Sequence, residues 1–192
     1  MDLLPGISSE IKEKAAAVKL ILMDVDGVLT EGKMYYFPGP DGLPAEFKGF
    51  NSQDGCGFHL AHHCGLKTGL ISGRESPGVV ERARILHISY VYQGFLEKEA
   101  IYDEILIRER EAGCALKDEN VAFIGDDFPD YPLIRRAGFG IAVQNARPEI
   151  KAAADYVTAS NGGEGAVREV FELVLKASGL WPLALAKYGL DK

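Results

Sequence analysis

The sequence predicts an α/β fold in which a parallel sheet is covered by helices on both faces. Short apolar runs without helical periodicity alternate along the chain with longer segments of helical character. This alternation is typical of parallel strands joined by right-handed crossovers. Most of the apolar runs are followed by polar or glycine residues, at the sheet edge where open α/β folds bind their ligands. The 192 residues are enough for one domain, residues 1–192, with a full core.

The composition is that of an ordinary globular protein, with 47% hydrophobic and 26% charged residues. A net charge of −7 argues against binding to nucleic acid or to an anionic membrane surface. No apolar run is long enough to span a bilayer, and the N-terminal residues lack the order of a signal peptide. Three cysteines are too few for a disulfide framework. We therefore expect a cytoplasmic protein that binds neither nucleic acid nor a membrane.

The first third of the chain combines a helix, a strand and a hairpin. Ser8 or Ser9 can cap a helix over residues 8–18, and a buried strand follows over 19–25. In residues 32–50, aromatic residues flank a cluster of Pro, Gly and Asp, which predicts a β-hairpin over about 33–50 with a turn near Pro40, Asp41 and Gly42. A small hairpin cannot bury its aromatic residues alone. We expect them to pack against another subunit or to shield the site.

The rest of the chain predicts alternating strands and helices in a Rossmann-like, three-layer arrangement. Strands are expected at 66–71, 88–92, 120–124, 139–143 and 156–157, and helices at 54–64, 76–86, 97–112, 129–137, 148–154 and 165–178. No insertion is long enough to form a lid domain over the site. Residues 179–192 are apolar for an exposed tail, and we expect this tail to dock on another subunit.

The first buried strand runs into Asp24 and Asp26. Side chains alternate across a strand, so these two carboxylates point the same way, while Val25 points back into the core. Gly27 allows a tight turn that brings backbone N–H groups close to whatever the carboxylates hold. Because neighbouring carboxylates repel each other, a cation or a shared proton is needed between them. A simple Asp-Gly turn is the alternative interpretation.

Later strands end in polar groups of complementary chemistry. These groups are Ser72, Gly73, Arg74, Lys98, Asp126, Asp127 and Asp130. In a parallel sheet they converge on one edge. Carboxylates gather a divalent cation such as Mg²⁺, whereas a hydroxyl, an ammonium group and backbone N–H groups gather an anion. The sequence therefore predicts a phosphate site beside magnesium.

These motifs together resemble the haloacid dehalogenase superfamily of phosphatases. The match is closer to its capless branch, which contains the 3-deoxy-D-manno-octulosonate 8-phosphate phosphatases and the related sialic-acid-type 9-phosphate phosphatases. The resemblance covers about residues 19–178 and rests on DVDGVLTEG, DGCGF, ISGRES, YQGFLEKEA, GDDFPDYP and GGEGAVREV. The superfamily commonly has Thr two residues after the second Asp, whereas Val28 is typical of this branch. The implied activity is phosphate release from an acidic sugar phosphate in a homotetramer.

The resemblance also implies a role for each site residue. Asp24 would be the nucleophile and Asp26 the proton donor and acceptor. Asp24, the backbone carbonyl of Asp26, and Asp126 would hold Mg²⁺. The phosphoryl group would be bound by Ser72 and Lys98, helped by N–H groups near Gly27 and Gly73. Asp127 and Asp130 would orient metal-bound water or Lys98, and Arg74 would bind the carboxylate of the substrate.

Several alternatives remain open at this stage. The segment Asn51-Ser52-Gln53 departs from the Val-Arg common there among octulosonate phosphatases, so a nine-carbon sugar or another small phosphorylated metabolite is also considered. A non-catalytic oligomerisation domain of the same fold is a third hypothesis, against which the retained acids argue. His59, His62 and His63 with Cys56 and Cys64 suggest a zinc site, but a helix with incidental histidines is favoured.

Overall fold

The computed structural model describes residues 3–40 and 42–190 and contains a six-stranded parallel sheet. The strand order is β5-β4-β1-β6-β7-β8, with β1 (Leu20–Met23), β4 (Lys67–Ser72), β5 (Tyr90–Gln93), β6 (Val121–Gly125), β7 (Phe139–Ala142) and β8 (Tyr156–Val157). The central strands β1, β4 and β6 are buried along almost their whole length. This burial explains their continuous apolar sequences.

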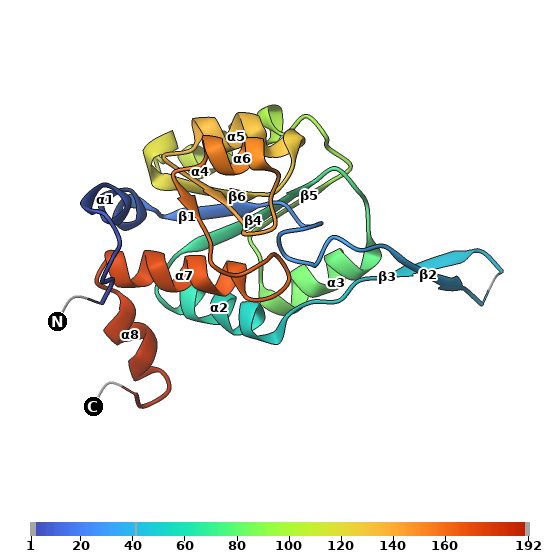
Figure 1. Cartoon of the computed structure of the whole chain (residues 1–192), viewed down its shortest axis with the longest axis horizontal. Helices are drawn as coiled ribbons and strands as arrows, with labels where there is room; N and C mark the ends of the chain where they lie inside the picture. The colour runs from blue at the N-terminus through green and yellow to red at the C-terminus, as the bar shows by residue number, and fades with distance from the viewer. Residues whose placement is uncertain (1–2, 41, 191–192) are drawn as a thin grey trace.

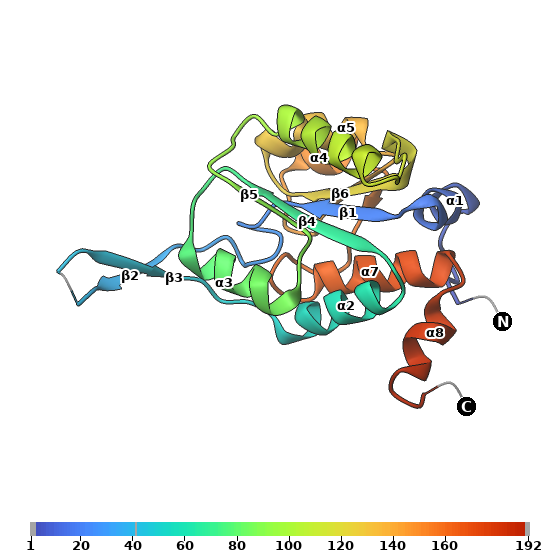
Figure 2. The same cartoon turned by 180° about the vertical axis from the view of Figure 1, so that it is seen from behind.

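Helices cover both faces of the sheet (Figures 1 and 2). One face carries α4 (Glu99–Glu111), α5 (Tyr131–Arg136) and α6 (Pro148–Ala153), and the other carries α2 (Ser52–His63), α3 (Pro77–Leu86) and α7 (Ala166–Ala177). The rings of Phe58 in α2 and Phe171 in α7 pack edge to face with centroids 4.9 Å apart, a favoured aromatic geometry. Figure 1 thus confirms the predicted three-layer Rossmann-like fold.

The register of the sheet brings three strand ends level with one another. Met23, the last residue of β1, pairs with Leu70 of β4 on one side and with Ile124 of β6 on the other. The N–H of Asp24 continues this ladder by donating to the carbonyl of Ile124 at 3.0 Å. The residues that follow β1, β4 and β6 therefore emerge at the same edge of the sheet.

A two-stranded antiparallel hairpin projects from the body on the side of this edge (Figures 1 and 2). It consists of β2 (Tyr35–Pro38) and β3 (Pro44–Phe47). Tyr35 and Phe47 stack with ring centroids 4.9 Å apart. The predicted turn includes Asp41, which lies outside the described residues. The hairpin is confirmed, and the described residues contain no cap domain.

Some element boundaries differ from the sequence prediction. Helix α2 begins at Ser52, before the predicted start at residue 54, because the Asn51 side chain accepts a hydrogen bond from the Gln53 N–H and caps the helix. Short 3₁₀ turns at Asp118–Asn120 and Phe128–Asp130 were not predicted. The chain begins with α1 (Ser9–Ala17), capped by Ser8 as expected.

The C-terminal segment also forms a helix that was not predicted. Helix α8 (Trp181–Ala186) contacts α7 and α2 of the same chain. The Lys176 ammonium lies 4.8 Å from the centroid of the Trp181 ring, and Ala184 is buried. Leu183, Tyr188 and Leu190 remain exposed. Part of the apolar tail is therefore covered by its own chain. None of the helices in the described parts of the chain is both long and apolar enough to cross a bilayer.

Close backbone contact between two glycine loops positions the site. The loop at Gly162 lies against the loop after β1, and a Cβ atom added at Gly162 would be 1.7 Å from the carbonyl oxygen of Gly27. The N–H of Gly163 also donates to the carbonyl of Val28 at 2.9 Å. An alanine at Gly162 can enter only if the loop after β1 moves.

We predict that Gly162→Ala lowers both stability and activity. Separation of the two loops should cost about 1–3 kcal/mol, as expected for overpacking a buried contact. Thermal unfolding and a phosphatase assay would measure the two effects. Gly49→Ala is the matched control, because an added Cβ at Gly49 meets nothing within 4 Å. Equal melting temperatures and activities of the two variants would show that the contact at Gly162 does not hold the loop after β1 in place.

Candidate active site

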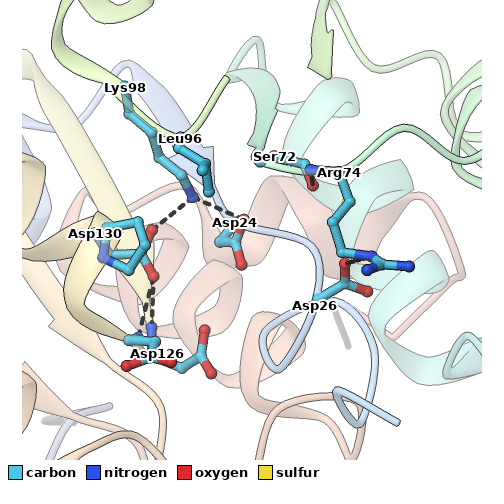
Figure 3. A pocket seen from close by; sticks show the side chains of 11 residues that line it. Asp24, Asp26, Ser72, Arg74, Leu96, Lys98, Asp126 and Asp130 are labelled. Carbon is cyan, nitrogen blue, oxygen red and sulfur yellow. Dashed lines mark hydrogen bonds and ion pairs between the residues drawn. The ribbon is translucent and has the colours of Figure 1, made fainter. Parts of the chain in front are cut away.

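A single pocket at the carboxyl edge of the sheet collects almost all of the predicted site residues (Figure 3). Its walls come from the segments that follow β1, β4, β5 and β6. It is lined by Asp24, Asp26, Ser72, Gly73, Arg74, Leu96, Lys98, Asp126, Asp127, Pro129 and Asp130. The parallel register thus brings together residues that lie up to about a hundred positions apart in the chain.

The Lys98 ammonium lies between two carboxylates at the centre of this pocket (Figure 3). Its Nζ atom is 2.7 Å from Oδ1 of Asp24 and 2.6 Å from Oδ1 of Asp130. The Lys98 side chain is buried. Burial opposes its charge, but Asp130 and Asp24 outweigh that effect, and the pKa of Lys98 is raised. Lys98 therefore stays protonated and offsets part of the negative charge.

Asp130 connects Lys98 to the turn after β6. Its Oδ2 atom accepts the N–H groups of Asp126 at 2.9 Å and Asp127 at 3.3 Å. Both carboxylate oxygens of Asp130 are therefore engaged within the protein. Asp130 therefore holds the turn and Lys98 in place.

The Asp126 carboxylate, by contrast, has an unused oxygen. Its Oδ1 atom is buried and has no hydrogen-bond partner. Burial first, and then the nearby charges of Asp130, Asp24 and Asp127, raise the pKa of Asp126 to about 8. Burial and the charge of Asp130 likewise raise the pKa of Asp24 to about 6. The pocket thus holds more carboxylate charge than Lys98 can balance.

The acid cluster has the geometry and chemistry of a divalent-cation site. One carboxylate oxygen from each of Asp24, Asp126 and Asp130 lies within 4.8 Å of the others. Hard carboxylate oxygens are the ligands that Mg²⁺ prefers. Gly27 lies against the Asp126 carboxylate with a φ of +96°, and a Cβ atom there would be 2.2 Å from Oδ2 of Asp126. Only glycine leaves room for this approach, and the residues present fit a bound Mg²⁺.

Ser72 and Gly73 form the rim opposite the acids. Ser72 ends β4 and is buried, and its Oγ atom accepts the N–H of Arg74 at 3.2 Å. The hydroxyl hydrogen remains available to donate into the pocket. A Cβ atom added at Gly73 would be 2.5 Å from Leu96 Cδ2, so glycine permits Leu96 to close this side.

Asp26 lies apart from the acid cluster, beside Arg74 (Figure 3). Its Oδ2 atom is 3.6 Å from Nε of Arg74, and its Oδ1 atom contacts the Lys48 ammonium. Lys48 and its neighbour Glu46 come from the end of the hairpin. The sequence analysis did not select either residue. The sequence signal that could have identified them is the pair of charged residues, Glu46 and Lys48, in a segment that is otherwise rich in aromatic residues.

Of the remaining candidates, Asp127 lines the pocket, whereas the histidines and cysteines do not. The Asp127 side chain is exposed and accepts the N–H of Phe128 at 2.8 Å, so it caps the 3₁₀ turn. His62 Nε2 lies 2.8 Å from Oγ1 of Thr68, and His59 and His63 are exposed. Among the residues that the structure describes, the acid cluster is the one group with metal-binding geometry. The interpretation of incidental histidines stays a prediction.

Comparisons with known proteins agree with the geometry. The family model for haloacid dehalogenase-like hydrolases matches residues 112–170. The 3-deoxy-D-manno-octulosonate 8-phosphate phosphatase of Escherichia coli K12 is 38% identical over 173 residues, which are 90% of this chain and 87% of that protein.

Solved structures have the same fold. A probable YrbI-family phosphatase of Pseudomonas syringae pv. phaseolica superposes with a TM-score of 0.87 at 40% identity, covering 94% of this chain and 98% of that one. The Moraxella catarrhalis 3-deoxy-D-manno-octulosonate 8-phosphate phosphatase, solved with magnesium, phosphate and 3-deoxy-D-manno-octulosonate, has a TM-score of 0.84 at 38% identity over 95% of this chain and 99% of that one.

The crowded carboxylates predict a pH-dependent stability of the metal-free protein. A carboxyl group whose pKa is higher in the folded state binds more protons when folded, so stability falls as pH rises from its unfolded pKa to its folded pKa. For Asp126 this window runs from the ordinary 3.8 to about 8. In EDTA, the melting temperature should decrease between about pH 5.5 and pH 8.5 by about 2–4 °C for each kcal/mol lost. Asp126→Asn should flatten this dependence; an unchanged slope in that variant would contradict the assignment.

Proposed function

The chain belongs to the 3-deoxy-D-manno-octulosonate 8-phosphate phosphatase family of haloacid dehalogenase-like hydrolases, and on this premise we propose that it is a Mg²⁺-dependent phosphatase acting on an acidic sugar phosphate, 3-deoxy-D-manno-octulosonate 8-phosphate. The observation that carries the proposal is the contact of Lys98 with Asp24 and Asp130 beside the unpartnered Asp126 oxygen. In this proposal Asp24 is the nucleophile, Lys98 the cation and Asp126 a metal ligand, and all three line one pocket.

In this proposal Asp24 is the nucleophile. One carboxylate oxygen attacks phosphorus, the bond from phosphorus to the sugar oxygen breaks, and an aspartyl-phosphate forms. Water then attacks phosphorus, the bond to Asp24 breaks, and inorganic phosphate leaves. The direct contact with Lys98 at 2.7 Å supports the role, because it fixes the position of the Asp24 carboxylate at the end of β1.

Asp26 transfers the protons in both steps. Its carboxyl group donates a proton to the leaving sugar oxygen, which becomes the alcohol, and the resulting carboxylate takes a proton from the attacking water. Its position supports this role, because it lies two residues beyond Asp24, in the same pocket but outside the acid cluster. The proton is thus returned to Asp26 after each turnover.

The negative charge of the phosphoryl group is balanced by groups on both sides of the pocket. Ser72 and Lys98 would donate to its oxygens, together with backbone N–H groups near Gly27 and Gly73. Asp24, Asp126 and the backbone carbonyl of Asp26 would hold Mg²⁺, with Asp127 and Asp130 in supporting roles. When bound, Mg²⁺ supplies positive charge that stabilises the transferring phosphoryl group.

Arg74 supports an acidic substrate. Its side chain is 45% exposed at the rim of the pocket, so its guanidinium group can bind a second anionic group beside the phosphate. The segment Asn51-Ser52-Gln53 departs from the Val-Arg common in octulosonate phosphatases. A nine-carbon, sialic-acid-type 9-phosphate is therefore the alternative substrate. The retained Asp24, Asp26, Lys98 and Asp126 argue against a non-catalytic oligomerisation domain.

The test is phosphate release from 3-deoxy-D-manno-octulosonate 8-phosphate with and without Mg²⁺. Wild-type enzyme should release phosphate only with the metal, and Asp24→Asn should lower kcat on the order of 10⁴-fold or more, as for loss of other nucleophiles. Asp103→Asn, a change at an exposed ion pair with Arg136, is the control. Activity on the nine-carbon phosphate or on generic phosphates alone would reject the substrate, and an active Asp24→Asn variant would reject the nucleophile.

We further propose that the chain forms a homotetramer and that it acts in the cytoplasm. The hairpin exposes Tyr36, Phe37 and Phe47, and the tail exposes Leu183 and Tyr188. Exposed apolar groups gathered on projecting elements are typical of interaction surfaces. The three cysteines are unpaired, in agreement with a reducing compartment.

Light scattering should return about four times the mass of the chain. Phe37→Glu, which places a charge among the exposed aromatic residues, should reduce this mass without lowering the stability of the fold, because Phe37 is 46% exposed. Lys33→Glu is a control on an exposed side chain next to the hairpin. A wild-type monomer at assay concentration would rule out the tetramer.

A further inference from the structure

A second buried lysine, Lys48, lies at the base of the hairpin. It follows β3 directly, where the hairpin rejoins the body, and its side chain is only 1% exposed. Its ammonium group contacts Oδ1 of Asp26 and lies 3.4 Å from Oε1 of Glu46 and 3.8 Å from the Met34 sulfur. Of the two carboxylates beside the buried Lys48 ammonium group, Asp26 is thus the closer.

Lys48 is part of a closed ring of alternating charges. Lys48 contacts Asp26, and Oδ2 of Asp26 lies 3.6 Å from Nε of Arg74. The Arg74 Nη2 atom lies 2.9 Å from Oε2 of Glu46, and the other oxygen of Glu46 faces Lys48. Two members come from the hairpin segment and two from loops after β1 and β4. Each oxygen of Asp26 therefore has its own cation.

The two buried lysines serve different carboxylates. Lys98 contacts Asp24 and Asp130 in the acid cluster, whereas Lys48 contacts Asp26. A buried ammonium group is costly without a carboxylate partner, so the Lys48 contact restricts where the Asp26 side chain can lie. A group that transfers a proton must lie within hydrogen-bond reach of the reacting oxygen, and small errors in its position lower the rate strongly.

We propose that Lys48 is a positioning residue that holds Asp26 for proton transfer to the leaving group. This inference rests on the proposed function, in which Asp26 is the proton donor. It adds a contribution of the hairpin to the chemistry of its own chain. A purely structural role for Lys48, as an anchor of the hairpin, would instead affect all substrates alike.

The leaving group separates these two roles. A sugar alkoxide needs a proton as it departs, whereas p-nitrophenolate departs readily without one. The ratio kcat/KM reports the steps up to the first irreversible one, here transfer of the phosphoryl group to Asp24. Loss of a positioned acid should therefore lower kcat/KM for a sugar phosphate far more than for p-nitrophenyl phosphate.

The experiment compares Lys48→Met with wild type on 3-deoxy-D-manno-octulosonate 8-phosphate and on p-nitrophenyl phosphate, both with Mg²⁺. We expect kcat/KM to fall by about 10- to 100-fold for the sugar phosphate and by less than about 2-fold for the aryl phosphate. Lys48→Arg should restore part of the loss. Lys33→Met is the matched control, because Lys33 is exposed and pairs with Glu31. Equal losses on both substrates, or no loss, would overturn the proposal.

A double-mutant cycle with Asp26→Asn provides an independent measurement. If Lys48 acts through Asp26, Lys48→Met should cause little further loss of sugar-phosphate activity in the Asp26→Asn background. Additive losses would reject the coupling. Should Lys48→Met fail to fold by circular dichroism, Lys48→Gln replaces it in the same cycle.

Failure of the proposed function would look different. A wild-type enzyme that hydrolyses p-nitrophenyl phosphate but not 3-deoxy-D-manno-octulosonate 8-phosphate would reject the proposed substrate. The Lys48 proposal would then be decided with another alkyl phosphate that the enzyme hydrolyses. The same comparison of the losses in kcat/KM on the alkyl and the aryl phosphate would apply.

Discussion

The contact of the Lys98 ammonium with Asp24 and Asp130 is the interaction on which the site depends. Three carboxylates share a largely buried pocket, and such a cluster is stable only when positive charge lies among them. Lys98 follows β5, the strand at one edge of the sheet. Asp130 follows β6, which lies on the far side of β4 and β1 from β5. The ammonium group therefore ties the loop after β5 to the loops after β1 and β6, two strands with which β5 does not pair. The place left beside Asp126 suits a divalent cation.

Much of the fold could be predicted because its signals are local. Apolar runs such as residues 20–23 and 121–124 have no helical period and are followed by acids or glycine, so the strands and the edge that carries the site could both be inferred. The convergence of Asp24, Ser72, Lys98 and Asp126 then follows from parallel pairing alone. The resemblance to a known family added roles for these residues, which contacts by themselves do not assign.

Other features could not be read from the sequence, because they depend on contacts between distant segments. Helix α8 is short, and Trp181 and Ala184 become covered only when α7 and α2 are in place. Lys48 has the sequence of an ordinary surface lysine between aromatic residues, and its burial depends on its contact with Asp26, which lies 22 positions earlier in the chain. The different environments of Asp126 and Asp127, adjacent in the chain, likewise arise from the turn held by Asp130.

The projection of the hairpin has a mechanical consequence. Its strands extend far from the body (Figure 2), while its base carries Lys48 and Glu46 into the ring around Asp26 and Arg74. A displacement of the hairpin would therefore move two of the four charged side chains of this ring. In the homotetramer that we propose, a subunit packed on the hairpin would therefore influence the position of Asp26 without any rearrangement of the sheet.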